Sequence, residues 1–326
     1  MNKPIHALRP RTLAVAAALA LGLSGLGLAP ATARAADPAA CRTVHISDIG
    51  WTDNQVTNAL FSTTLDALGY KADIKTLSEE VTYAGIKAKK IDVFLDDWTP
   101  SMDAITGPYV KSKAMQQIGP NMTGAKYTLV VPTYLYDQGL KTFADIAKFG
   151  KQLHYKIYGI EPGNDGNVHI LKMIKTNAFG LKHFKLVQSS EQGMLAEVAR
   201  LYPQKKDIVF LGWEPHPMNV NFQLSYLAGG HKYFGPKEGA AAIYTNVRYG
   251  YVQACPNVGK LLTNLHFTVQ AESAMMNDIL NKKMDASVVA KNWMKAHPAV
   301  VKSWLSGVTT LGGKPGLPAV TKAISG

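Results

Sequence analysis

The sequence predicts an α/β fold of two lobes, each a mostly parallel sheet flanked by helices. Short β-prone runs alternate with segments of helical periodicity through most of the chain. The 326 residues suffice for one large domain or for two lobes of roughly 100 to 150 residues each. A turn-rich stretch from 105 to 125 separates two alternating series, so we place a crossover into a second lobe there.

The first 35 residues have the pattern of a secretory signal peptide. Lys3, Arg9 and Arg11 form a positive start, 12–28 is an Ala/Leu/Gly run, and Ala33-Arg34-Ala35 is a small-x-small cleavage site. A retained membrane anchor is the alternative, but the apolar run is short and a proline soon follows it. We expect export, and therefore a periplasmic mature protein.

Charge and motifs argue against several classes of function. The formal charge of +12 falls to +8 without residues 1–35, because that segment holds four cations and no anion. The remaining cations are scattered, which is typical of a solvated surface and not of a nucleic-acid-binding protein. The chain has no zinc-binding helix, nucleophile elbow or phosphate loop, and its nine histidines are far apart in sequence. We expect no catalytic residue, no metal and no cofactor, although an enzyme on the same two-lobed scaffold is a rival class.

The two cysteines are expected to pair. Cys41 and Cys255 would be exported into an oxidising compartment, where a pair tends to close. The rival interpretation is a lipidated Cys41, which Asp37 and Pro38 disfavour because they separate it from the apolar run. A Cys41–Cys255 disulfide requires the start of the last third of the chain to lie against the first strand. The first lobe would then be discontinuous, and the second lobe an insertion.

The expected elements follow this plan. In the first lobe we expect a strand at 43–48, a helix beyond Trp51, a strand at 71–77, a helix at 81–89 and a strand at 91–95. In the second we expect strands at 127–131, 156–160, 186–188 and 207–211, with helices at 142–149, 168–176 and 193–202. A strand over 244–254 returns to the first lobe, and the tail is helical at 258–265, 270–281, 286–296 and 299–306 before a Gly/Pro-rich end. The predicted domains are 36–125 with 245–326 for lobe one and 126–244 for lobe two, joined by two crossing strands that act as a hinge.

Four aromatic residues stand at the edges of apolar runs: Trp51, Trp98, Tyr127 and Trp213. A single tryptophan in such a place is more often part of a core, as we expect for Trp293 and Trp304 in the tail helices. Several at strand ends in both lobes instead suggest one pocket, because ligands of open α/β sheets sit outside the carboxyl ends of the strands. Converging aromatic faces suit a quaternary ammonium ion, which cannot donate hydrogen bonds.

The loop 161–167, Glu-Pro-Gly-Asn-Asp-Gly-Asn, allows two interpretations. It lacks the Gly-Lys-Ser/Thr of a phosphate loop, and its acidic residues would repel an anion. A turn with Asn167 as helix N-cap is the simpler interpretation. Asn164, just after Gly163, is nevertheless a plausible hydrogen-bonding side chain for a ligand.

The order and spacing of four motifs identify a resemblance to a known family: 48–53 (Asp-Ile-Gly-Trp-Thr-Asp), 96–98 (Asp-Asp-Trp), 162–166 (Pro-Gly-Asn-Asp-Gly) and 212–216 (Gly-Trp-Glu-Pro-His). Over the whole mature chain, the sequence resembles the periplasmic choline-binding proteins of ABC importers, within the glycine betaine/choline/proline substrate-binding family. The resemblance implies a type II periplasmic binding protein fold, a monomer, and an ABC transporter permease as partner. It also fits the Cys41–Cys255 disulfide.

The family's site residues carry over one at a time. The resemblance implies an aromatic box of Trp51, Trp98, Tyr127 and Trp213, with Asp53 as the pocket carboxylate and Asn164 as the pocket amide; Glu214 and His216 receive no pocket role. Asp53 would repel the carboxylate of glycine betaine but accept a hydrogen bond from a hydroxyl, so choline ranks first among the ligands. Glycine betaine or another quaternary ammonium ligand is the alternative, as is a ligand sensor without a transport role.

Overall fold

The computed structural model describes residues 37–325, so the predicted signal peptide lies outside the described residues. The described residues belong to one compact unit. No helix between residues 37 and 325 combines the length and the apolar character needed to cross a bilayer.

A single mixed sheet of nine strands runs through this unit in the order β2-β1-β3-β9-β4-β7-β5-β6, with β8 paired to β4. The strands are β1 (Thr43–Asp48), β2 (Lys71–Thr76), β3 (Val93–Thr99), β4 (Met115–Pro132), β5 (Lys156–Tyr158), β6 (Lys185–Val187), β7 (Phe210–Glu214), β8 (Leu224–Tyr226) and β9 (Ala240–Arg248). Pairing is parallel within β2-β1-β3 and within β7-β5-β6. These two parallel groups form the sheets of lobe one and lobe two.

Helices flank both groups. The longer ones are α1 (Thr52–Ala67), α2 (Glu79–Lys87), α3 (Asp103–Lys111), α5 (Asp165–Lys175), α6 (Glu191–Leu201), α11 (Pro256–Asn264), α12 (Val269–Leu280), α13 (Ala286–Ala296), α14 (Pro298–Trp304) and α15 (Gly316–Ser325). Short helices are α4 (Thr133–Asp137), α7 (Met218–Asn221), α8 (His231–Phe234), α9 (Pro236–Gly239) and α10 (Tyr251–Ala254), and 3-10 turns lie at Ala39–Cys41, Phe143–Phe149, Ala178–His183 and Tyr202–Gln204. The C-terminal helices α12, α13 and α15 pack against α1. The last helix of the described chain therefore packs against its first long helix.

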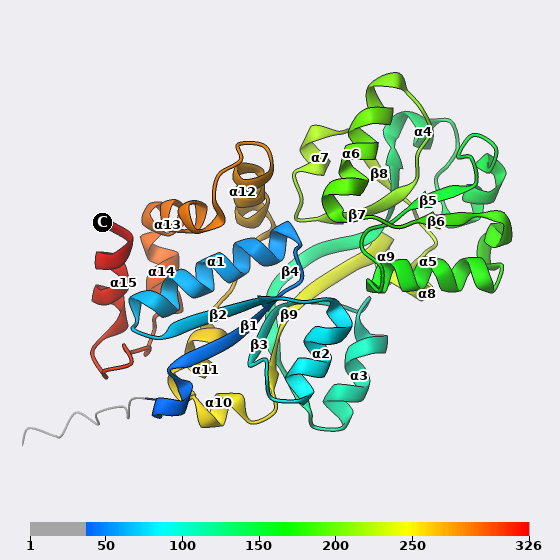
Figure 1. Cartoon of the computed structure of the whole chain (residues 1–326). Helices are drawn as coiled ribbons and strands as arrows, with labels where there is room; N and C mark the ends of the chain where they lie inside the picture. The colour runs from blue at the N-terminus through cyan, green and yellow to red at the C-terminus, as the bar shows by residue number, and fades with distance from the viewer. Residues whose placement is uncertain (1–36, 326) are drawn as a thin grey trace, which may run out of the picture. The chain divides into compact units, whose positions relative to one another are not determined.

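Two long strands, β4 and β9, cross between the parallel groups and pair with each other antiparallel, side by side in Figure 1. Their register shifts at three places, between Gln117 and Pro120, between Pro120 and Met122, and between Thr123 and Ala125. The predicted domain boundaries, 125/126 and 244/245, fall within these two strands. They stay predictions as boundaries.

The composition of each strand matches its position in the sheet. All but the last residue of β3, a central strand, is buried, as expected where helices cover both faces. The edge strand β2 is mostly exposed and carries Lys71 and Lys75, charges that discourage pairing with another chain.

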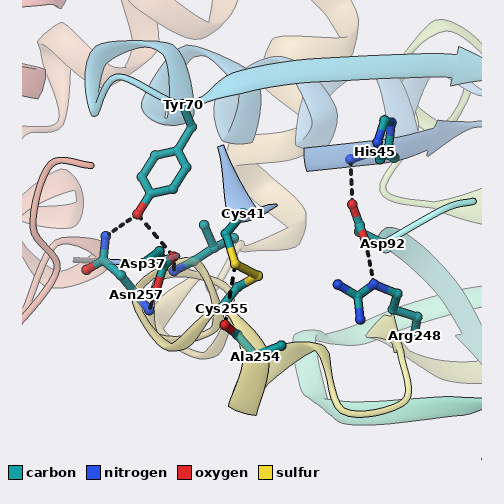
Figure 2. The surroundings of a disulfide bond; sticks show 10 residues. Asp37, Cys41, His45, Tyr70, Asp92, Arg248, Ala254, Cys255 and Asn257 are labelled. Carbon is teal, nitrogen blue, oxygen red and sulfur yellow. Dashed lines mark hydrogen bonds and ion pairs between the residues drawn. A yellow bond between two sulfur atoms is a disulfide. The ribbon is translucent and has the colours of Figure 1, made fainter. Parts of the chain in front are cut away.

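The predicted disulfide is confirmed: the Sγ atoms of Cys41 and Cys255 lie 1.99 Å apart, and the Cα atoms 5.7 Å apart (Figure 2). Beside it, Asp37 accepts hydrogen bonds from the backbone N–H of Asn257 at 2.7 Å and the hydroxyl of Tyr70 at 3.1 Å. These contacts fix the start of α11 beside the first strand.

An ion pair lies near the disulfide in Figure 2. Arg248, the last residue of β9, places Nε 2.5 Å from Oδ1 of Asp92, whose Oδ2 accepts from the backbone N–H of His45 at 2.9 Å. The end of the returning strand is thereby tied to β1.

Several expected element bounds are wrong. The turn-rich stretch 105–125 contains most of α3 and the first part of β4. Pro108 is accommodated within the helix, and Gly119, Pro120 and Gly124 lie at shifts in the register with β9. The return strand ends at Arg248, not 254, and α10 follows it. The Gly/Pro-rich C-terminal end contains a helix, α15, which packs against α1 and α13.

Candidate functional site

The six ligand residues expected from the sequence line one pocket: Trp51, Asp53, Trp98, Tyr127, Asn164 and Trp213, joined by Ile160 and Asp165. Together these side chains bound about 260 Å³ of space free of protein atoms, part of it open to solvent. No lysine or arginine is among the lining residues.

Each lobe supplies part of the lining. In lobe one, Trp51 is the N-cap residue of α1, Asp53 lies in the first turn of that helix, and Trp98 lies in β3. Tyr127 lies in β4 and Trp213 in β7, directly opposite each other in the antiparallel pair. The sequence suggested that Trp98 and Trp213 lie where loops begin, but both lie within strands. The sheet therefore fixes where both rings lie.

The four aromatic side chains are buried, with exposed fractions of 4 to 6%. Tyr127 is the central ring: its centroid lies 5.8 Å from that of Trp98 and 6.4 Å from that of Trp213. The angle between the planes of Tyr127 and Trp213 is 80°. Rings at steep angles present faces from different directions, which is the arrangement that surrounds a compact cation.

The polar part of the lining is held by hydrogen bonds. Oδ1 of Asn164 accepts from the hydroxyl of Tyr127 at 3.1 Å and from the backbone N–H of Asn167 at 3.1 Å, while Nδ2 donates to Asp165 at 2.9 Å. Asn164, not Asn167, is therefore the N-cap of α5. Its amide nitrogen keeps a second hydrogen that can be donated to a ligand oxygen.

Asp53 is the carboxyl that faces the pocket from lobe one. Its Oδ1 accepts from the backbone N–H of Asn54 at 3.0 Å. Burial raises the pKa of Asp53 well above its usual range, and the nearby carboxyls of Asp96 and Glu191 raise it further. A ligand cation would oppose these effects, because its charge favours the ionised form.

Further carboxyl groups lie near Asp53. Burial raises the pKa of Asp96, and repulsion by Glu272 adds to the shift; burial likewise raises the pKa of Glu272, with Asp53 adding to it. Asp96 accepts from Nε1 of Trp98 at 3.0 Å, which holds that indole in place. Because the lining holds carboxyl groups and no lysine or arginine, the site favours a cation and disfavours an anion. Among residues 37–325, no three His, Cys, Asp or Glu side chains are placed to hold a metal ion.

Sequence reasoning did not identify Asp165, Glu161 and Glu191 as site residues. Asp165, by sequence an acidic residue of the loop 161–167, lines the pocket. Glu161 accepts from Nε1 of Trp51 at 2.8 Å, and Glu191 accepts from Thr52, so both link to the turn that carries Trp51 and Asp53. Their pairing partners are more than 100 positions away in the chain, and no local pattern could have revealed them.

His216, which sequence reasoning left without a pocket role, lies against a wall of the pocket. Its ring centroid is 4.9 Å from that of Trp213. Nδ1 accepts from the backbone N–H of Met218 at 2.9 Å, so the neutral ring carries its hydrogen on Nε2, which lies 3.1 Å from Oε1 of Glu191.

Comparison with known proteins identifies a family and similar solved structures. Residues 42–296 match the family described as the substrate binding domain of the ABC-type glycine betaine transport system. The chain is 51% identical to an ABC-transporter choline binding protein solved in complex with choline, covering 88% of this chain and 100% of that one, with a TM-score of 0.87. For the unliganded semi-closed form of an ABC-transporter choline binding protein, the identity is also 51%, the coverage 87% and 99%, and the TM-score 0.81.

A curated relative is more distant. The glycine betaine/carnitine transport binding protein GbuC of Listeria monocytogenes is 30% identical over 164 residues, which is half of this chain and 53% of that protein. The family match, by contrast, extends through both lobes and includes every aromatic residue of the pocket. The chain therefore belongs to the family of substrate-binding domains of ABC-type glycine betaine transport systems.

Proposed function

We propose that this protein captures choline outside the cytoplasm and delivers it to the permease of an ABC importer, by closure of two lobes over an aromatic box. The observation that carries the proposal is the pocket itself: three tryptophans and one tyrosine, together with acidic and amide side chains and no cationic one. Each aromatic face contributes about 0.5 to 2 kcal/mol toward binding a quaternary ammonium ion. After the costs of ordering are subtracted, four faces and apolar burial support a free energy near about −8 kcal/mol, which corresponds to micromolar affinity.

The polar groups favour choline over glycine betaine. Asp53 can accept a hydrogen bond from the choline hydroxyl, and the remaining amide hydrogen of Asn164 can be donated to the hydroxyl oxygen. A betaine carboxylate would meet Asp53 and Asp165 in the lining without a lysine or arginine to bind it. The sequence identity to a protein solved with choline supports the same choice.

The proposal includes closure of lobe two, 126–244, against lobe one, 36–125 with 245–326, about the crossing strands. Export to the periplasm and function as a monomer belong to it as well. Family membership supports the transport context, and the contacts from lobe two to Trp51 and Thr52 support closure.

Calorimetric titration of the mature protein with choline, acetylcholine, glycine betaine and carnitine tests the proposal, and tryptophan fluorescence provides an independent reading of the same equilibria. We expect choline to bind most tightly, with quenching or a spectral shift from the pocket indoles. Tighter binding of glycine betaine would reject the choice of ligand, and no binding of any of the four would reject the function.

A further inference from the structure

Helix α1, which begins beside Trp51 and carries Asp53, has no capping side chain at its N-cap position. Its N-cap residue is Trp51, whose side chain makes no capping hydrogen bond. The first N–H groups of a helix have no partner within the helix and need one from elsewhere. For Thr52, the first residue of α1, that partner comes from lobe two: Oε2 of Glu191 accepts from its backbone N–H at 2.9 Å, and Oε1 accepts from its hydroxyl at 2.7 Å.

Glu191 is held for this contact by its own lobe. It is the first residue of α6, whose N-cap Ser190 accepts from the backbone N–H of Gly193. His216, with its hydrogen on Nε2, is placed to donate to Oε1 of Glu191. Three donors thus point at one carboxyl group that is 1% exposed, and two of them come from Thr52 in lobe one.

The reverse contact has the same construction. Glu79 is the first residue of α2 in lobe one, and its N-cap Ser78 accepts from the backbone N–H of Val81. Oε2 of Glu79 accepts at 3.2 Å from the backbone N–H of Asp165, the first residue of α5 in lobe two. In both lobes a Ser-Glu pair starts one helix, and its glutamate meets the first N–H of a helix in the other lobe.

We propose that Glu191 and Glu79 are positioning residues for ligand capture, each capping across the cleft the helix that carries pocket side chains of the opposite lobe. Glu191 caps α1 beside Trp51 and Asp53, and Glu79 caps α5 beside Asn164. A carboxylate at a helix N-terminus is favoured by the helix dipole as well as by hydrogen bonding. Since the two partners come from different lobes, these caps form on closure, and their stabilisation belongs to the closed, ligand-holding form. This inference rests on the proposed function.

Conservative variants test it. We expect Glu191→Gln and Thr52→Val each to weaken choline binding about tenfold, which corresponds to about 1.4 kcal/mol, mainly through faster dissociation. Thr52→Val adds no charge change and keeps the backbone N–H, so it remains informative if Glu191→Gln folds poorly. Glu79→Gln is expected to have a smaller effect, because its cap is a single bond of 3.2 Å. Glu80→Gln, an exposed glutamate one position along the same helix, is the control and should bind as wild type.

Two readouts separate positioning from general structural support. In the Glu191→Gln and Thr52→Val variants the melting temperature of the ligand-free protein should be unchanged, and the ratio of affinities for choline and acetylcholine should also be unchanged, because neither residue lines the pocket. A lower melting temperature with unchanged affinity would overturn the proposal, and so would wild-type dissociation rates in both variants.

Hydrogen exchange at the backbone amides of Thr52 and Asp165 tests the caps directly in the choline-saturated proteins. Faster exchange at Thr52 in choline-saturated Glu191→Gln than in choline-saturated wild type supports the cap, and equal exchange overturns it. If wild-type protein binds none of the four quaternary ammonium compounds, the proposed function fails; if it binds choline and exchange at Thr52 is equal in both proteins, only the caps fail.

Discussion

Replacing Trp51 tests the aromatic box through two separable contributions. The ring forms one wall of the pocket, worth about 1 kcal/mol as a cation–π face in the middle of the usual range. Its Nε1–H donates to Oε1 of Glu161 in lobe two at 2.8 Å. Because Glu161 is only partly buried and can regain water when the bond is lost, this bond contributes about 1 kcal/mol to the binding free energy. Trp51→Ala removes both, so we expect a loss of about 2 kcal/mol, or roughly thirtyfold in choline affinity.

Trp51→Phe isolates the hydrogen bond, because phenylalanine keeps an aromatic face and has no N–H. We expect a loss of about 1 kcal/mol, roughly fivefold. The assay is calorimetric titration with choline at constant ionic strength, supported by dissociation rates from stopped-flow fluorescence. Trp293→Phe is the matched control: Trp293 stacks on Trp304 among the tail helices, outside the pocket, so this change should leave choline affinity unaltered.

The result that would refute this reasoning is retained affinity in Trp51→Ala. Equal losses for the alanine and phenylalanine variants would instead show that the ring face contributes nothing and that only the contact with Glu161 matters.

Three further outcomes are expected. Asp53→Asn should weaken choline at least about tenfold and weaken glycine betaine less, so an equal loss for both by calorimetry would exclude a selective role. Replacing Cys41 and Cys255 together by serine should lower the free energy of unfolding in urea by at most roughly 5 kcal/mol, since the bond closes a loop of more than 200 residues, with choline affinity unchanged; unchanged stability would contradict this. Burial raises the pKa of Asp97 to about 6, so the folded protein binds this proton more tightly than the unfolded chain, and stability from this group falls as pH rises from about 4 to about 6. Asp97→Asn should therefore remove up to about 3 kcal/mol of that fall in ligand-free protein, measured as urea stability against pH, and an unchanged slope would refute it.

Part of the site was predictable because it depends on local pattern. Trp51 lies shortly after β1 and Trp98 near the end of β3, and the parallel order of these two strands brings both residues to one edge of the sheet. The aromatic type and the family resemblance then suffice to identify the wall residues. The two cysteines could be paired because an exported chain with only two has one possible internal bond.

Other features depend on long-range packing and leave no local signal. Gly119, Pro120 and Gly124 are typical of a loop, yet the pairing of β4 with β9 takes them into a strand and accommodates them as irregularities. The same holds for Glu191, an ordinary first-turn acid by sequence, whose partner Thr52 is 139 positions away.

The three register shifts between β4 and β9 bear on the proposed closure of the two lobes. A regular ladder resists bending along its whole length, whereas irregular steps concentrate deformation at a few residues. All three shifts lie between residues 117 and 125 of β4, before Tyr127 and the strand segment that pairs with β7. Rotation there would be a rigid-body hinge motion. The box residues of each lobe would keep their relative geometry during this rotation. The cation would then bind between two preformed surfaces that closure brings together.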